Sequence, residues 1–154
     1  MVKVLETSSG FIGAGGEHAV ASELIFRGFN ASIMSVDTGI DVVAVKNGRT
    51  YNVQVKTSTL NKSGWYTFDI RMVSLERHSA SDVYYIFVLR LDEKNQYVIL
   101  PSTEIEKSIS TGGIYTVKKY DKYRVAFKLS NEQLILGQKS NDITYYLNNW
   151  SIIK

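Results

Sequence analysis

Apolar and polar residues alternate most regularly between residues 40 and 56, and this pattern predicts a β-hairpin. Asn47-Gly48 favours a two-residue turn, because both central residues of that turn need positive φ. The pairing then sets Ala44 opposite Tyr51 and Asp41 opposite Gln54. Side chains alternate between the two faces of a strand. One face is therefore predicted to be core: Ile40, Val42, Ala44, Tyr51, Val53 and Val55. The other face gathers Asp41, Gln54 and Lys56 at the end away from the turn.

Before the hairpin, the spacing predicts a helix from residue 16 or 17 to Arg27, stopped by Gly28. Its buried stripe would hold Val20, Ala21, Leu24 and Ile25. Residues 1–16 are expected to be loose, and their glycine-rich part at 8–16 to form a flexible lead-in rather than a phosphate loop. A short strand is expected at residues 30–36.

After the hairpin, strands are expected at residues 65–71, 82–90 and 96–100. The stretch 82–90 is almost continuously apolar, which is typical of a strand buried on both faces. Residues 72–81 fit a loop or one helical turn. Thr103 and Glu106 have the spacing of a capping box for a helix ending near Gly112.

Residues 114–129 alternate again, and the tail from residue 131 is predicted to be helical in two short pieces. The second piece would place Ile143, Tyr146, Leu147 and Trp150 on one side. This order of elements predicts an α/β fold with a mixed sheet.

Composition narrows the functional classes. At 154 residues the chain is expected to form one domain. It has no cysteine, which excludes disulfides and thiolate metal sites. Neither a membrane-spanning apolar run nor a signal-peptide pattern is found, so a cytoplasmic or nucleoid-associated location is expected. The net charge of +3 is compatible with a nucleic-acid partner but is equally ordinary for a soluble protein.

The polar end of the hairpin is the strongest candidate for chemistry. Directly opposed Cβ atoms lie about 4.5–5.5 Å apart in such a ladder, so an acid, an amide and an ammonium group would meet there. Glu17 lies in line with the buried stripe of the first helix and needs a polar partner. Two plainer readings remain open. The hairpin residues fit an ordinary polar cross-strand cluster, and Glu17 fits an acidic residue that complements the helix dipole.

Over roughly residues 13–100 the chain resembles the PD-(D/E)XK nuclease superfamily. The resemblance lies in the active-site pattern formed by Glu17, Gly39-Ile40-Asp41 and Gln54-Val55-Lys56. The pattern departs in two places: Ile40 replaces the proline, and Gln54 replaces the middle acid, as in Mrr-like and homing members. The resemblance implies a restriction-endonuclease-like mixed central β-sheet flanked by helices. It would occupy residues 1–154, with a core of about 13–129 and a C-terminal helical extension at 130–154.

The resemblance also implies a Mg²⁺-dependent endonuclease, with Mn²⁺ able to substitute. Asp41 would be the main metal ligand, joined by the Gln54 side chain, the Val55 carbonyl and Glu17. Lys56 would orient the attacking water and stabilise charge; an ammonium beside a phosphate keeps its proton and is not expected to act as the base. The substrate would be double-stranded or branched DNA, and the protein a homodimer or higher oligomer. The tail around Tyr146 and Trp150 would supply the interface or pack on its own sheet.

A basic stretch is the best candidate for nucleic-acid contacts: Lys118, Lys119, Lys122 and Arg124, interleaved with tyrosines. Protective lysines on an edge hairpin give the same pattern. Thr57 and Ser58 follow Lys56 and are candidate phosphate contacts. Two rival functions remain: an inactive nuclease-fold module that only binds nucleic acid, and a protein-interaction domain with no affinity for polyanions.

Overall fold

The computed structural model describes residues 8–36, 38–79 and 82–154. Its centre is a five-stranded mixed sheet in the order β1-β2-β3-β5-β6. The strands span Asn30–Ile33, Val42–Lys46, Arg49–Thr59, Val83–Leu91 and Lys94–Pro101. Only β3 and β5 are parallel; the other neighbours are antiparallel. The expected α/β class with a mixed central sheet is confirmed.

The hairpin register expected from Asn47-Gly48 is confirmed, since Ala44 pairs with Tyr51 and Lys46 with Arg49. Both turn residues have positive φ, 52° at Asn47 and 75° at Gly48. The ladder stops at Val42, however, and Asp41 lies just outside β2. The chain turns there, so that Ile40 is buried in the opposite core cluster from Val42 and not on the same face as expected.

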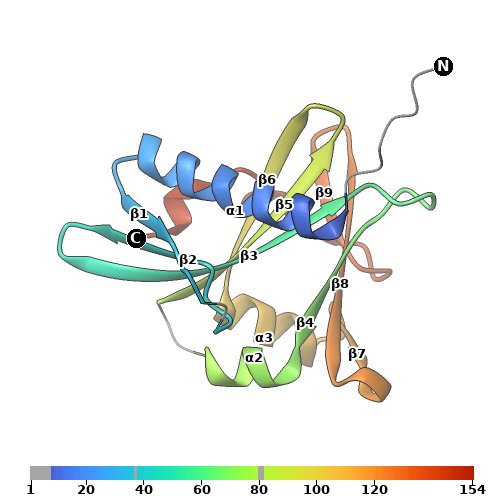
Figure 1. Ribbon diagram of the computed structural model, residues 1–154. Coiled ribbons are helices and arrows are strands. Elements are labelled where there is room, and N and C mark those ends of the chain that lie inside the picture. The colour runs from blue at the N-terminus through green and yellow to red at the C-terminus, as the bar shows by residue number, and fades with distance from the viewer. Residues whose placement is uncertain (1–7, 37, 80–81) are drawn as a thin grey trace.

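The buried strand β5 separates two cores. Tyr84, Ile86 and Val88 face α1, whereas Tyr85, Phe87 and Leu89 face the second sheet and the other helices. Helix α1 (Ser9–Phe26) crosses one face of the central sheet, and α2 (Met72–Arg77) and α3 (Ser102–Ser110) lie on the other side (Figure 1). The both-faces burial expected for this strand is confirmed.

Helix α1 begins earlier than expected. It starts at Ser9 and includes the glycine-rich segment that the sequence suggested would be loose; residues 1–7 lie outside the described part of the chain. One of these glycines has a packing reason, because a Cβ on Gly16 would lie 1.7 Å from the Thr57 hydroxyl oxygen. Val20, Ala21 and Leu24 are buried as expected, but Ile25 is exposed.

A second, antiparallel sheet packs beside α2 and α3. It has the order β10-β9-β8-β4, with β7 paired to β8, and it consists of Asn141–Asp142, Gln133–Leu136, Lys122–Ser130, Tyr66–Arg71 and Tyr115–Val117. The helical assignment of the tail is therefore wrong in its first part, which extends this sheet. The expected capping box is also not formed, since Pro101 is the N-cap of α3 and no side chain caps it.

The end of the tail consists of two 3₁₀ turns, η2 (Thr144–Tyr146) and η3 (Trp150–Ile152). Trp150 is buried against Tyr97, and Leu147 bridges to Val98 of β6. Of the two expectations for the tail, the structure shows packing on its own sheet. By length and hydropathy, no helix in the described residues qualifies as a membrane span.

Candidate functional site

Asp41 directly precedes β2 and is held by hydrogen bonds of both its backbone and its side chain. Its backbone N–H donates to the Val53 carbonyl at 2.9 Å, and its own carbonyl accepts from the Met34 N–H at 2.9 Å. Its Oδ2 accepts a hydrogen bond from the Val55 N–H at 2.7 Å. The carboxylate therefore occupies the edge of β3 that a longer β2 would have covered.

The Val55 carbonyl lies on this same edge. The N–H and C=O of one strand residue point to the same neighbour. Since the Val55 N–H donates to Asp41, the Val55 carbonyl points to the same side of β3, beyond the end of the β2–β3 pairing. The Asp41 carboxylate and the Val55 carbonyl therefore lie on the same edge of β3.

Gln54 and Lys56 share the other face of β3, away from α1. Their partners across the parallel ladder are Tyr85 and Phe87, both part of the core beneath the second sheet. Gln54 is only 6% exposed, and its Oε1 is buried with no hydrogen-bond partner among the described residues. An acceptor left in this state costs about 1–3 kcal/mol.

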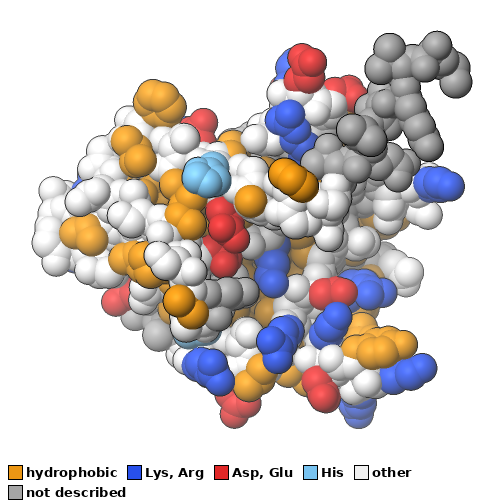
Figure 2. Space-filling model, viewed as in Figure 1, with side chains coloured by type: hydrophobic (Ala, Val, Ile, Leu, Met, Phe, Trp, Pro, Cys, Tyr) orange, Lys and Arg blue, Asp and Glu red, His pale blue; other side chains and the backbone are white. Residues whose placement is uncertain are grey.

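Glu17 approaches from the opposite side of the sheet, on α1. It is half-buried and directly follows Gly16, whose backbone touches Thr57. The helix therefore holds Glu17 at the level of the Lys56–Thr57 segment of β3. Figure 2 shows acidic and basic side chains beside one another below α1 on this face, with further Lys and Arg side chains toward the lower right.

These groups fit a hard divalent cation. Carboxylate, amide and main-chain oxygens are the ligands that Mg²⁺ prefers, and the orphaned Gln54 Oε1 is an acceptor that a cation would satisfy. The site does not rest on a cluster of charged ligands: within the described ranges no three His, Cys, Asp or Glu side chains group together. Its oxygens would come from an amide and the backbone as well as from carboxylates.

The sequence did not point to Tyr85, which lies beside Gln54 through the β3–β5 pairing. It is fully buried, and its hydroxyl has no partner among the described residues. Burial, with a smaller effect of the nearby Glu106 charge, raises the Tyr85 pKa to about 12. The hydroxyl keeps its proton and adds a neutral polar group to the core that Gln54 faces. Only the parallel pairing of distant strands brings the two together.

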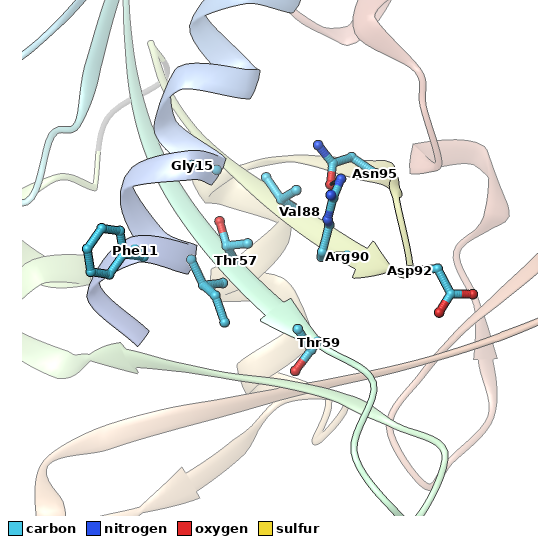
Figure 3. Close-up of a pocket in the computed structure, with 10 residues that line it drawn as sticks. Phe11, Gly15, Thr57, Thr59, Val88, Arg90, Asp92 and Asn95 are labelled. Carbon is cyan, nitrogen blue, oxygen red and sulfur yellow. Dashed lines mark hydrogen bonds between the residues drawn. The ribbon is translucent and has the colours of Figure 1, made fainter. Parts of the chain in front are cut away.

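A groove of about 710 Å³ lies on the α1 side of the sheet, across β3 from Gln54 and Lys56. In Figure 3 the Arg90 guanidinium lies beside Asn95, to which it donates at 3.1 Å, while Asp92 points away from the groove. Thr57 belongs to this groove, with its hydroxyl buried beneath α1. Ser58 is on the Lys56 face and donates to the Thr59 carbonyl at 3.1 Å.

The basic stretch forms part of the second sheet. Lys118 and Lys119 lie in η1 (Lys118–Tyr120), and Lys122 and Arg124 lie on β8. Arg124 donates to Asp69 at 3.0 Å, and Lys122 is 3.9 Å from the same carboxylate. Two of the four cations are thus partly neutralised within the chain.

Comparisons with known proteins bear on the fold. No protein-family model and no curated protein sequence matches the chain. Among solved structures, the chain is similar to a bacterial homing endonuclease, I-Ssp6803I, with 18% identity, 96% of this chain and 92% of the other covered, and a TM-score of 0.64. It is also similar to D212, a nuclease from a fusselovirus, with 13% identity, coverage of 98% and 93%, and a TM-score of 0.52.

A weaker similarity, with a TM-score of 0.48 and 14% identity, relates 73% of the chain to 81% of the Archaeoglobus fulgidus Holliday junction resolvase Hjc. The homing endonuclease and the viral nuclease match nearly the whole chain, so their likeness covers both sheets and the tail. The chain therefore has the same overall fold as this homing endonuclease and this viral nuclease.

Proposed function

We propose that the protein is a metal-dependent endonuclease that hydrolyses phosphodiester bonds in DNA, with Glu17, Asp41, Gln54 and Lys56 as its active site. The observation that carries this proposal is the junction of β2 and β3. There, Asp41 binds the edge of β3 at Val55, and Gln54 keeps a buried oxygen without a partner among the described residues. The nuclease fold gives this arrangement a functional context.

Each side chain has a distinct role in the proposal. Asp41, Gln54 and the Val55 carbonyl would hold Mg²⁺ or Mn²⁺, and Glu17 would join them from α1. The bound cation would supply charge neutralisation at the phosphate and a more acidic water. Lys56, next to this edge, would orient the attacking water by hydrogen bonding and stabilise negative charge on the phosphoryl oxygens. The apolar core behind Gln54 limits water around these groups, which strengthens their electrostatic effect.

The substrate is proposed to be double-stranded or branched DNA, bound by basic groups outside the metal site. Lys118 and Lys119 are the better candidates for phosphate contacts, because Lys122 and Arg124 already face Asp69. A homodimer or higher oligomer is proposed because cleavage of two strands needs two sites.

The test is nicking of supercoiled plasmid with Mg²⁺ or Mn²⁺. We expect activity in the wild type, and a loss of at least 100-fold in Asp41→Ala and in Lys56→Ala. Lys94→Ala, at the exposed tip of the β5–β6 hairpin, is the matched charge control and should nick normally. Equal activity in the wild type and both active-site variants would show that the cleavage comes from elsewhere.

The second candidate, a binding module without catalysis, is favoured by one observation. Gln54 stands where the resembled pattern has an acid, and an amide oxygen binds a cation more weakly than a carboxylate does. This candidate requires salt-dependent binding to DNA without nicking of duplex, junction or RNA substrates in either cation.

A further inference from the structure

The turn that leads into Asp41 is held from outside by His78. The His78 Nε2 lies 2.9 Å from the Thr38 carbonyl oxygen, a contact between residues 40 positions apart. A carbonyl oxygen can only accept, so Nε2 carries the proton and donates. His78 is thereby the donor that ties the β1–β2 connection to the end of α2.

The same imidazole is packed against Gly39. A Cβ at Gly39 would lie 2.9 Å from Nε2 and 3.0 Å from Cδ2, and the φ of Gly39 is +92°. Only a residue without a side chain combines this backbone conformation with this approach. The His78 ring therefore packs against the turn at a place where only glycine fits.

His78 can act as an anchor because its own position is fixed. Its N–H donates to the Ser74 carbonyl at 3.1 Å, and Leu75 of the same helix is buried in the core beneath the second sheet. The described side chains of the connection differ in burial. Met34 and Val36 are 38% and 69% exposed, and Ile40 is the buried residue that precedes Asp41.

From these contacts we infer that His78 is a positioning residue that sets the place of the Asp41 carboxylate by holding Thr38–Gly39 against α2. The inference rests on the proposed function for its consequence in metal binding. Mutation of a residue that orients a metal ligand typically lowers metal affinity or activity by about 10–100-fold.

Two variants separate the hydrogen bond from the bulk of the ring. His78→Ala removes the donor, whereas His78→Gln keeps an N–H at similar reach. Amide hydrogen exchange is measured at Asp41 and Met34, whose N–H groups bond across this connection, with Val43 and Ala44 of β2 as internal references. We expect His78→Ala to lower protection at Asp41 and Met34 at least tenfold, and His78→Gln to stay within about threefold of the wild type.

Mn²⁺ binding to the same proteins gives the functional readout. We expect its Kd to rise about 10–100-fold in His78→Ala and to recover in His78→Gln. Gly39→Ala should behave like His78→Ala, and Glu76→Ala, on the exposed side of α2, should behave like the wild type.

Unchanged exchange at Asp41 in His78→Ala would overturn the inference, as would a glutamine variant no better than the alanine variant. A wild-type protein that binds no Mn²⁺ would count against the proposed nuclease centre. It would not affect the His78 contact, which the exchange data decide independently.

Discussion

At the scale of single residues, the site depends on polar atoms whose partners are unusual. Asp41 uses one oxygen to bind a main-chain N–H, and Gln54 buries an oxygen that no described residue satisfies. Natural proteins seldom leave buried acceptors unpaired. Gln54 is thus a residue at which a bound cation would change stability.

Gln54→Glu tests this directly. Position 54 is only 6% exposed, and a carboxylate buried there lowers stability unless a cation compensates its charge. In EDTA we therefore expect the thermal midpoint of Gln54→Glu to be lower than that of the wild type. Mn²⁺ at about 100 times the Kd of the variant should raise its midpoint by roughly 5–10 °C, and the same Mn²⁺ concentration should raise the wild-type midpoint by less. Gln54→Met, of similar shape and without the oxygen, should respond to Mn²⁺ less than the wild type does. An equal response in all three proteins would mean that the cation binds elsewhere.

At the scale of elements, α1 is a helix with many glycines of which one has a clear packing reason. Gly16 is pressed against Thr57, whereas a Cβ on Gly13 would meet nothing within 4 Å. The close approach of α1 to β3 at Gly16 determines how far Glu17 lies from β3.

Substitution of these two glycines by alanine should therefore change the stability of the protein in opposite directions. We expect Gly16→Ala to lower the free energy of unfolding by about 1–3 kcal/mol, because the new methyl group overlaps Thr57. Gly13→Ala should raise it by about 0.5–1 kcal/mol through helix propensity alone. Urea unfolding of both variants measures the difference; a similar effect in the two would contradict the close contact.

The start of η2 gives a prediction about pH. Hydrogen bonds from the Thr144 hydroxyl, Gln133 and the Thr144 N–H lower the Asp142 pKa from 3.8 to about 2. A carboxyl whose pKa is depressed on folding stabilises the protein above its unfolded pKa, and this contribution is lost as pH falls through the folded value. We expect Asp142→Asn to flatten the fall in thermal midpoint between about pH 4 and pH 2. Glu132→Gln, on the turn before β9, is the control for loss of one negative charge and should leave that slope unchanged.

At the scale of the whole molecule, the central sheet has a core on each face, and the tail closes one of them. Trp150 is 7% exposed, with its ring 5.0 Å from that of Tyr97 and the Arg27 guanidinium 4.8 Å from its centre. The tail is thus part of the fold on the α1 side, and its Trp150 ring is not available to a second copy of the chain.

Trp150→Ala should accordingly destabilise each chain rather than separate chains from one another. We expect a loss of about 3–5 kcal/mol in the free energy of unfolding, measured by denaturant titration. Tyr145→Ala, at a position 70% exposed in the same tail, should stay within about 0.5 kcal/mol of the wild type. A change in sedimentation without a change in stability would instead place Trp150 in an interface.

Local signals were sufficient for the hairpin, for the doubly buried β5 and for the grouping of Gln54 and Lys56 on one face of β3. Each depends on neighbours in sequence: a turn that needs positive φ at Asn47-Gly48, and the two-residue period of a strand. The same rules failed at Ile40, because a strand period no longer applies where the ladder ends. They failed also for the early start of α1, where residues 9–15 are helical although glycine is a poor helix former.

Tertiary structure alone decided the second sheet, the burial of Trp150 and the surroundings of the candidate site. The pairing of β4 with β8, the Asp41–Val55 hydrogen bond, the neighbourhood of Gln54 and Tyr85 and the His78–Thr38 contact all join residues far apart along the chain. Such contacts form only when the two cores have placed their elements, and no periodicity encodes them. The amino-acid sequence therefore determined which side chains are available for chemistry, and the packing of distant elements determined where their polar atoms meet.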